Sequence, residues 1–247
     1  MLGPIDVDQS VLRLPFGGEA VFLRPKGAHK AVVSLHGGPE SYEWSNLRYG
    51  GLYRRLLRDG FCVVIFNYAG STHLGSQART ACHGNFAHAV LEEFSTIKTT
   101  LAGEYRINLD HVSLFGGSFG GTLALQIATK NICKRIAVSS PVSDLTRHVK
   151  RLENEQDYVT WFTCRFSDKD FNSLSLDRLS DCRAKDVYLW QGEDDHICSF
   201  SDTVELVQRL SAKGKSVKAD FPKVIGHVPR SPSELTSYIQ WATAALL

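Results

Sequence analysis

Long apolar runs and biased segments are absent from this 247-residue sequence. None of its apolar runs approaches the roughly 20 residues that a bilayer-spanning helix requires. Residues 1–6 lack the cationic start and the apolar core of a secretory signal. No repeat, linker or low-complexity stretch divides the chain. We therefore expect a soluble, cytoplasmic protein with one domain over residues 1–247 and no membrane partner.

An excess of one charge is missing as well. Lys and Arg number 28 and Asp and Glu number 26, so the formal net charge is +2. The cations are dispersed, whereas a nucleic-acid-binding surface needs a basic patch or stripe. We expect no nucleic-acid partner, and a homo-oligomer is not excluded by the sequence.

Paired cysteines are also lacking. The six cysteines form no CxxC pair and no metal-ligand spacing, and Cys62 and Cys133 lie in apolar runs that are typical of a core. The histidines have no ligand spacing either. We expect reduced thiols, no metal and no cofactor. Cys198 follows a candidate catalytic acid by three residues, and its role stays open, although most such cysteines are ordinary apolar side chains.

What the sequence does contain is an alternation of short apolar runs with longer amphipathic ones. This rhythm is typical of an α/β fold, in which a mostly parallel sheet is covered by helices on both faces. Strands are expected at 11–14, 20–24, 31–35, 61–66, 112–115, 135–139, 187–190 and 216–221, the first two as a hairpin. Helices are expected at 47–58, 86–102, 122–130, 201–212 and 233–246.

One segment, residues 141–183, breaks this rhythm because it is rich in charge and contains scattered aromatic residues. We interpret it as a helical insertion. Ligands bind above the carboxyl ends of strands in an open α/β sheet, so an insertion that follows a strand is placed to form a lid or a substrate wall. The alternative is a surface insertion that has no function in the site.

A glycine-rich hexapeptide, residues 116–121, connects a strand-like run to a helix-like run. A G-x-S-x-G turn bends the chain so sharply that its serine adopts strained backbone geometry. Gly116 and Gly120 occupy the positions at which a Cβ atom would collide. The turn predicts Ser118 as a nucleophile, and a phosphate-binding or purely structural glycine turn is the alternative.

A serine nucleophile needs a base, and the base needs a carboxylate. In this architecture the acid follows a late strand and the histidine follows the last one. We assign Asp195 as the acid and His227 as the base. Rival carboxylates and imidazoles leave alternatives open: Asp194, Glu193, His196 and His148.

The reaction also requires N–H donors for an oxyanion. The residue after the nucleophile normally supplies one donor, and a glycine-rich loop after an early strand supplies the other. We assign the backbone N–H groups of Phe119 and Gly38, with Gly37 as the neighbouring alternative. These elements in this order predict a serine hydrolase, because a binding module would not require all of them.

The same segments resemble the α/β-hydrolase superfamily and, within it, the catalytic domain of the prolyl oligopeptidase family, including acylaminoacyl-peptidase-like members. The resemblance is carried by the HGGP loop at 36–39, the NYAGST segment at 67–72, the GGSFGG elbow, the G-x-x-D turn at 192–195 and Gly226-His227. It covers most of residues 28–247 and is weakest across 141–183. It implies an α/β-hydrolase fold and a serine peptidase or related hydrolase that forms an acyl-enzyme at Ser118.

Three features depart from that family. Few residues precede the first core strand, so we expect no N-terminal β-propeller. Ala69 replaces the arginine of the family's NYRGST segment, and His196-Ile197-Cys198 replaces the usual approach to a valine. We expect a peptidase or amidase acting on a short peptide or another small acylated amine. A carboxylesterase or thioesterase, and an acyltransferase or peptide cyclase, are the alternatives that use the same residues.

Overall fold

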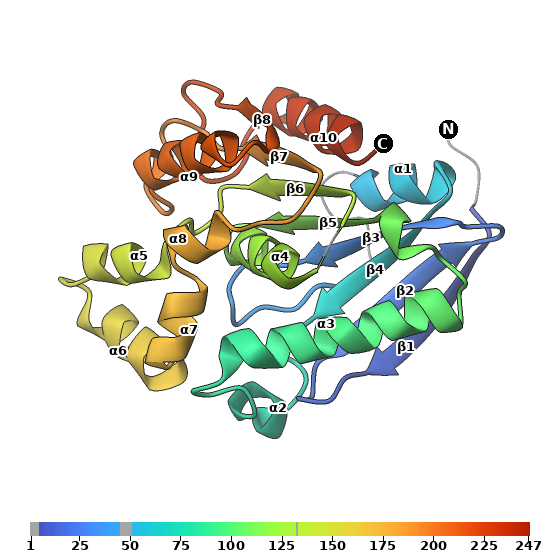
Figure 1. Ribbon diagram of the computed structural model, residues 1–247, viewed down its shortest axis with the longest axis horizontal. Coiled ribbons are helices and arrows are strands. Elements are labelled where there is room, and N and C mark those ends of the chain that lie inside the picture. The colour runs from blue at the N-terminus through green and yellow to red at the C-terminus, as the bar shows by residue number, and fades with distance from the viewer. Residues whose placement is uncertain (1–4, 45–50, 132) are drawn as a thin grey trace.

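The fold is built around one eight-stranded sheet with the order β1-β2-β4-β3-β5-β6-β7-β8 (Figure 1). A computed structural model describes residues 5–44, 51–131 and 133–247. The strands are β1 (Val7–Arg13), β2 (Glu19–Pro25), β3 (Lys30–Leu35), β4 (Phe61–Asn67), β5 (Val112–Gly117), β6 (Arg135–Ser139), β7 (Asp186–Trp190) and β8 (Ser216–Asp220). Strands β1 and β2 form the expected hairpin, and the pairs from β4 through β8 are parallel. The predicted mostly parallel sheet is confirmed.

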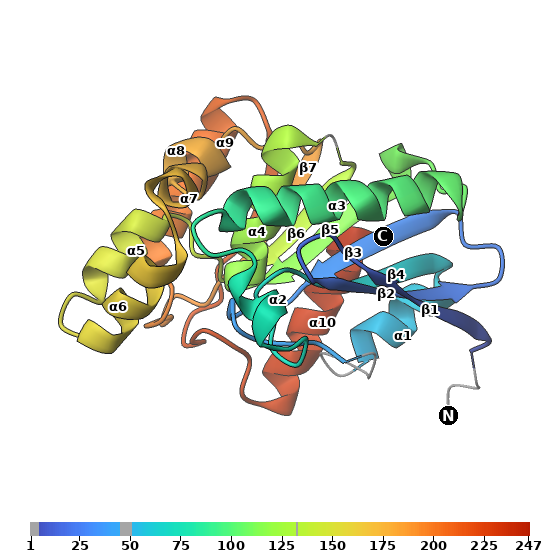
Figure 2. The ribbon, with the colours of Figure 1, turned by 90° about the horizontal axis from the view of Figure 1, so that it is seen from below.

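Helices cover both faces of this sheet (Figure 2). They are α1 (Leu52–Arg58), α2 (Ser76–Thr80), α3 (Phe86–Gly103), α4 (Phe119–Lys130), α9 (Phe200–Ala212) and α10 (Pro232–Leu246). One core cluster contains Phe94 of α3 and Leu123 of α4, and a second contains Leu56 of α1 and Ala242 of α10. Every residue of β4 is buried, because a strand covered on both faces needs apolar side chains on both.

Helix 47–58 is described only from Leu52 onward, because residues 45–50 lie outside the described part of the chain. The short helix α2 was not predicted. Among the described residues, no helix combines the length and the apolar character that a membrane crossing requires.

The insertion between β6 and β7 is helical, as predicted. It contains α5 (Leu145–Arg151), α6 (Gln156–Arg165), α7 (Asp168–Ser173) and α8 (Leu176–Leu179), which lie together at one side of the molecule in Figure 1. Side chains cap these short helices: Asp144 accepts from the N–H of Arg147, and Ser167 with Asp170 forms a capping box. Asp144 also accepts from the N–H of Leu176 at 2.9 Å, so one carboxylate joins α5 to α8.

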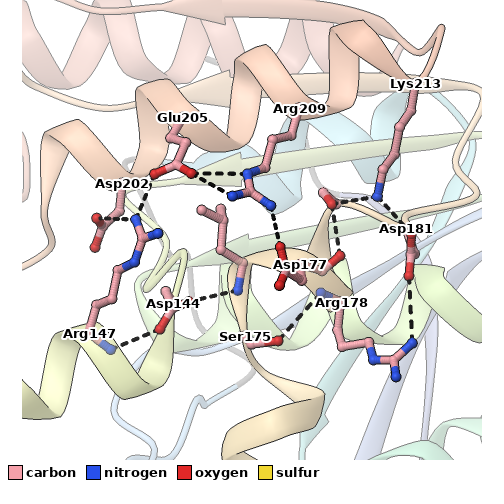
Figure 3. A network of polar contacts seen from close by, with 12 residues as sticks. Asp144, Arg147, Ser175, Asp177, Arg178, Asp181, Asp202, Glu205, Arg209 and Lys213 are labelled. Atoms are coloured by element: carbon pink, nitrogen blue, oxygen red, sulfur yellow. Dashed lines mark hydrogen bonds and ion pairs between the residues drawn. The ribbon is translucent and has the colours of Figure 1, made fainter.

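Charged side chains then join the insertion to α9 (Figure 3). Arg147 of α5 contacts Glu205 at 2.6 Å and Asp202 at 3.3 Å. Arg209 of α9 pairs with Asp177 of α8. The insertion is therefore held against the main part of the fold by ion pairs on one side, and α9 positions it.

Candidate active site

The elbow places Ser118 between β5 and α4 with φ 53° and ψ −130°, a conformation that side-chain-bearing residues rarely adopt. Its N–H donates to the carbonyl of Ser139 at 2.8 Å, which holds the turn against β6. A Cβ atom at Gly116 would come within 3.0 Å of the Gly120 carbonyl, and one at Gly120 would come as close to the Leu35 carbonyl. The two glycines are thus required by close backbone packing around a strained serine.

The predicted acid and base are in contact. Nδ1 of His227 lies 2.9 Å from Oδ2 of Asp195, with the side chains 15% and 0% exposed respectively. Oδ2 also accepts from Nε2 of Gln191 at 3.0 Å, and Oδ1 accepts from the N–H groups of Ile197 and Cys198, both at 2.9 Å. Every lone-pair direction of this carboxylate is engaged, which holds it in one orientation toward the imidazole.

The electrostatics of Asp195 favour its ionised form. Burial acts to raise the pKa of the carboxyl, but the hydrogen bond and the charge of His227, together with the N–H groups of Cys198 and Ile197, outweigh it. The pKa therefore lies below its ordinary value. An ionised carboxylate at Nδ1 selects the tautomer in which Nε2 can accept a proton.

The rival carboxylates point elsewhere. Glu193 and Asp194 are exposed, and Asp194 meets the histidine loop only through its N–H, which donates to the Ile225 carbonyl at 3.1 Å. A Cβ atom at Gly192 would overlap that same carbonyl. The acid turn and the histidine loop thus pack backbone against backbone, and of these three carboxylates only that of Asp195 contacts His227.

The rival histidines line the same cavity without contacting the acid. His148 projects from α5, and burial, followed by the charge of Arg151, lowers its pKa. His196 is exposed. In the described part of the chain, neither imidazole hydrogen-bonds to Asp195, whereas His227 does.

Cys198 lies beside Ser118 in the cavity. Among the described residues no hydrogen bond joins Ser118 to His227, and the Ser118 hydroxyl contacts the Cys198 thiol. Burial and the charge of Asp195 raise the pKa of that thiol, and the hydroxyl only partly offsets them. Catalytic hydrogen bonds are often long before substrate binds, so this arrangement is compatible with a nucleophile and base that engage later. The position of Cys198 three residues after the acid was the only sign of this contact in the sequence.

The predicted oxyanion donors flank the nucleophile. Phe119 opens α4, and the first N–H groups of a helix have no acceptor within the helix. Gly38 adopts φ +129° and lines the cavity together with Ser118 and Phe119. A Cβ atom at Gly37 would lie 3.1 Å from Cβ of Ser118, so this alternative glycine approaches the serine closely.

A cavity of about 620 Å³ opens over Ser118. Much of its apolar and aromatic lining comes from the elbow and the insertion: Phe119, Val142, Leu152, Tyr158, Trp161 and Phe162. Phe119 packs against Phe166 at 5.8 Å between ring centroids, and Phe166 packs against Phe162 at 5.7 Å. The aromatic residues noted in the sequence thus form a wall of the cavity.

An ion pair joins this wall to the glycine loop. Arg165 of α6 contacts Glu40 at 2.9 Å, and Arg79 contacts it at 3.1 Å. Burial acts to raise the pKa of Glu40, but both arginines hold it below its ordinary value. The Arg165 guanidinium also lies 4.4 Å from the Trp161 ring. Sequence reasoning missed Glu40 and Arg165, because no local pattern connects residues so far apart.

Comparisons with known proteins agree on one family. Residues 52–244 match the model of the prolyl oligopeptidase family. Over 115 residues the chain is 31% identical to the acylamino-acid-releasing enzyme of Homo sapiens. This aligned segment covers 44% of this chain and 15% of that enzyme.

Solved structures support the same fold. A puromycin-hydrolyzing peptidase of Mycobacterium tuberculosis has a TM-score of 0.84 at 18% identity, over 98% of this chain and 39% of that one. The acylaminoacyl peptidase of Pyrococcus horikoshii has a TM-score of 0.83 at 15% identity, over 96% of this chain and 41% of that one. This chain thus spans less than half the length of the relatives named here.

Proposed function

Because the chain belongs to the prolyl oligopeptidase family, a family of serine peptidases with the α/β-hydrolase fold, we propose that it cleaves an amide bond through an acyl-enzyme on Ser118. The substrate class is a short peptide or another small acylated amine. The observation that carries this proposal is the hydrogen bond between Asp195 and His227 beside the strained elbow. A turn that served only to bind phosphate would not need this pair.

Acylation begins with the proton of Ser118. Asp195 holds Nδ1 of His227, so Nε2 accepts the serine proton while Oγ forms a bond to the substrate carbonyl carbon. The negative charge that develops on the carbonyl oxygen is stabilised by the N–H groups of Phe119 and Gly38 and by the N-terminus of α4. The ionised Asp195 stabilises the imidazolium that forms.

Breakdown of the tetrahedral intermediate returns that proton. His227 protonates the departing nitrogen as the carbon–nitrogen bond breaks, and the acyl group stays on Ser118. His227 then takes a proton from water as the water oxygen attacks the ester carbon. It returns this proton to Oγ of Ser118 as the bond between carbon and Oγ breaks and the acid is released. We propose that the insertion forms the lid of this site, since His148 of α5 and Tyr158, Trp161 and Phe162 of α6 line the cavity.

A fluorophosphonate probe tests the nucleophile. Intact-protein mass spectrometry should show one adduct on the native chain and none on Ser118→Ala. Ser113→Ala, which removes a buried serine from the strand β5 that leads into the elbow, is the matched control and should be labelled like the native chain. Labelling that persists in Ser118→Ala would overturn the assignment.

Measured turnover of different substrates then shows which leaving group the enzyme accepts. A series of amide, ester and thioester substrates with one acyl group should be hydrolysed by the native chain, with the amide cleaved at a measurable rate. Hydrolysis of the esters alone would replace the peptidase proposal by an esterase. Product formed only when an amine acceptor is added would show acyl transfer.

A further inference from the structure

The mechanism proposed above does not use the thiol of Cys198, although that thiol lies in the site. Cys198 is 1% exposed, lines the cavity beside Ser118 and contacts its hydroxyl. A buried thiol in contact with the candidate nucleophile can affect the reaction whenever something binds to its sulfur.

Three kinds of metal ligand meet at this thiol. A carboxylate oxygen of Asp195, the Sγ atom of Cys198 and a ring nitrogen of His227 all lie within 4.8 Å of one another. In the ranges 5–44, 51–131 and 133–247, no other three groups of this kind come so close. Zinc is bound by sulfur, nitrogen and oxygen at about 2.0–2.3 Å, which places ligands of one tetrahedral ion roughly 3–4 Å apart. The Sγ atom of Cys198 and the ring of His227 are therefore near the spacing that two ligands of one ion require.

The hydrogen bonding already resembles that of a histidine bound to zinc. Nδ1 of His227 is held by Asp195 at 2.9 Å, which leaves Nε2 for a cation. Metal-bound histidines almost always bond through their other nitrogen to a carboxylate or carbonyl, which orients the ring. The amides of Ile197 and Cys198 and the side chain of Gln191 hold that carboxylate in place. Asp195 therefore occupies the position of an outer partner rather than that of a ligand.

We propose that Sγ of Cys198 and Nε2 of His227 form a reversible binding site for Zn²⁺, with Asp195 as the partner of the histidine, and that the bound ion inhibits the enzyme. Binding releases the Cys198 thiol proton to solvent, the thiolate and the neutral imidazole each donate a lone pair to the ion, and no electron is transferred. An imidazole whose lone pair is occupied cannot accept the serine proton, so this regulation rests on the function proposed above.

The test measures zinc binding directly on the full chain and does not depend on turnover. Metal-free native protein is titrated with Zn²⁺ against a chromophoric zinc indicator, alongside Cys198→Val, Cys198→Ser and His227→Gln. The matched control is Cys164→Ser, which removes an exposed thiol. We expect one tight equivalent for the native chain and the control, and affinity lower by about 100-fold or more for the three site variants, since loss even of an outer partner costs about 10–100-fold. Unfolding midpoints verify that each variant is folded.

The outcomes separate this inference from the function on which it rests. If the native chain binds no zinc, or if the folded Cys198 variants bind it as tightly as the native chain, the site is wrong. Fluorophosphonate labelling of Ser118 should be suppressed by Zn²⁺ in the native chain and unaffected by it in Cys198→Val. Labelling that continues at saturating zinc in the native chain overturns the inhibition. Absence of labelling without zinc would contradict the serine hydrolase, while the indicator titration would still decide the zinc site.

Discussion

At the scale of single residues, the two neighbouring aspartates of the acid turn differ in what they face. Asp195 is buried against His227, whereas Asp194 is exposed and contributes only its backbone. Asp195→Asn should lower kcat/KM by roughly 10³–10⁴-fold, because a neutral amide no longer selects the productive tautomer of the base. Asp194→Asn is the matched control and should change kcat/KM less than about twofold. Steady-state kinetics on the series of amide, ester and thioester substrates measure kcat/KM for both variants. A larger loss of kcat/KM in Asp194→Asn would make Asp194, and not Asp195, the acid.

Gly192 gives a second prediction at this scale. A Cβ atom there would overlap the Ile225 carbonyl, and backbone on both sides of the contact leaves little room to relax. Gly192→Ala should therefore separate the acid turn from the histidine loop, and should lower the free energy of unfolding by about 2 kcal/mol or more. Activity should fall together with stability. Gly103→Ala is the control, because a Cβ atom at Gly103 would meet open space, and this variant should retain activity.

At the scale of elements, the insertion depends on its ion pairs with α9. Asp202 is 5% exposed and contacts Arg147 at 3.3 Å and Arg151 at 2.6 Å. Asp202→Ala should lower the free energy of unfolding by about 1–3 kcal/mol, since both arginines lose a buried acceptor. It should also raise KM more than it lowers kcat, because His148 of α5 lines the cavity, while the proposed catalytic groups lie on other elements.

Urea unfolding and steady-state kinetics check this prediction. Asp177→Ala is the matched control: its side chain is 80% exposed and it pairs with Arg209 of the same helix α9. We expect that surface pair to contribute little to stability. Equal effects of the two substitutions would show that burial of Asp202 does not matter.

At the scale of the whole molecule, one buried carboxylate makes stability depend on pH. Glu93 of α3 accepts from the N–H of Gly18 at 2.8 Å and from that of Ala69 at 2.7 Å, so it joins the hairpin, the segment after β4 and the helix. Burial raises the pKa of Glu93 from 4.5 to about 7, against the lowering effect of these N–H groups. The folded chain therefore binds this proton more tightly than the unfolded chain does.

The sign of the effect follows from that difference. Between about pH 4.5 and pH 7 the folded state holds more protons at this site, so the free energy of unfolding falls as the pH rises through this window and levels off above it. A shift of this size corresponds to about 3 kcal/mol at most. Glu93→Gln should lack this component, and the exposed neighbour Glu92→Gln should keep it. Urea unfolding at pH 5, 6, 7 and 8 measures the difference, and parallel curves for the native chain and Glu93→Gln would contradict it.

Much of the architecture could be predicted from local pattern. The boundaries of β6 agree with the expected strand, and α3 and α9 differ from expectation by one residue at an end. The helices α2, α5, α6, α7 and α8 were not individually predicted, because helices of so few residues depend on caps and on the surfaces they pack against.

The sequence by itself determined the mostly parallel sheet, the glycine elbow at Ser118 and the order of serine, acid and histidine, because each follows from neighbouring residues and from the periodicity of apolar side chains. Only the tertiary structure decided which carboxylate meets His227, how the insertion encloses the cavity and that the Cys198 thiol touches Ser118. These features depend on side-chain direction and on the packing of segments far apart in the chain, and residue order alone does not specify either.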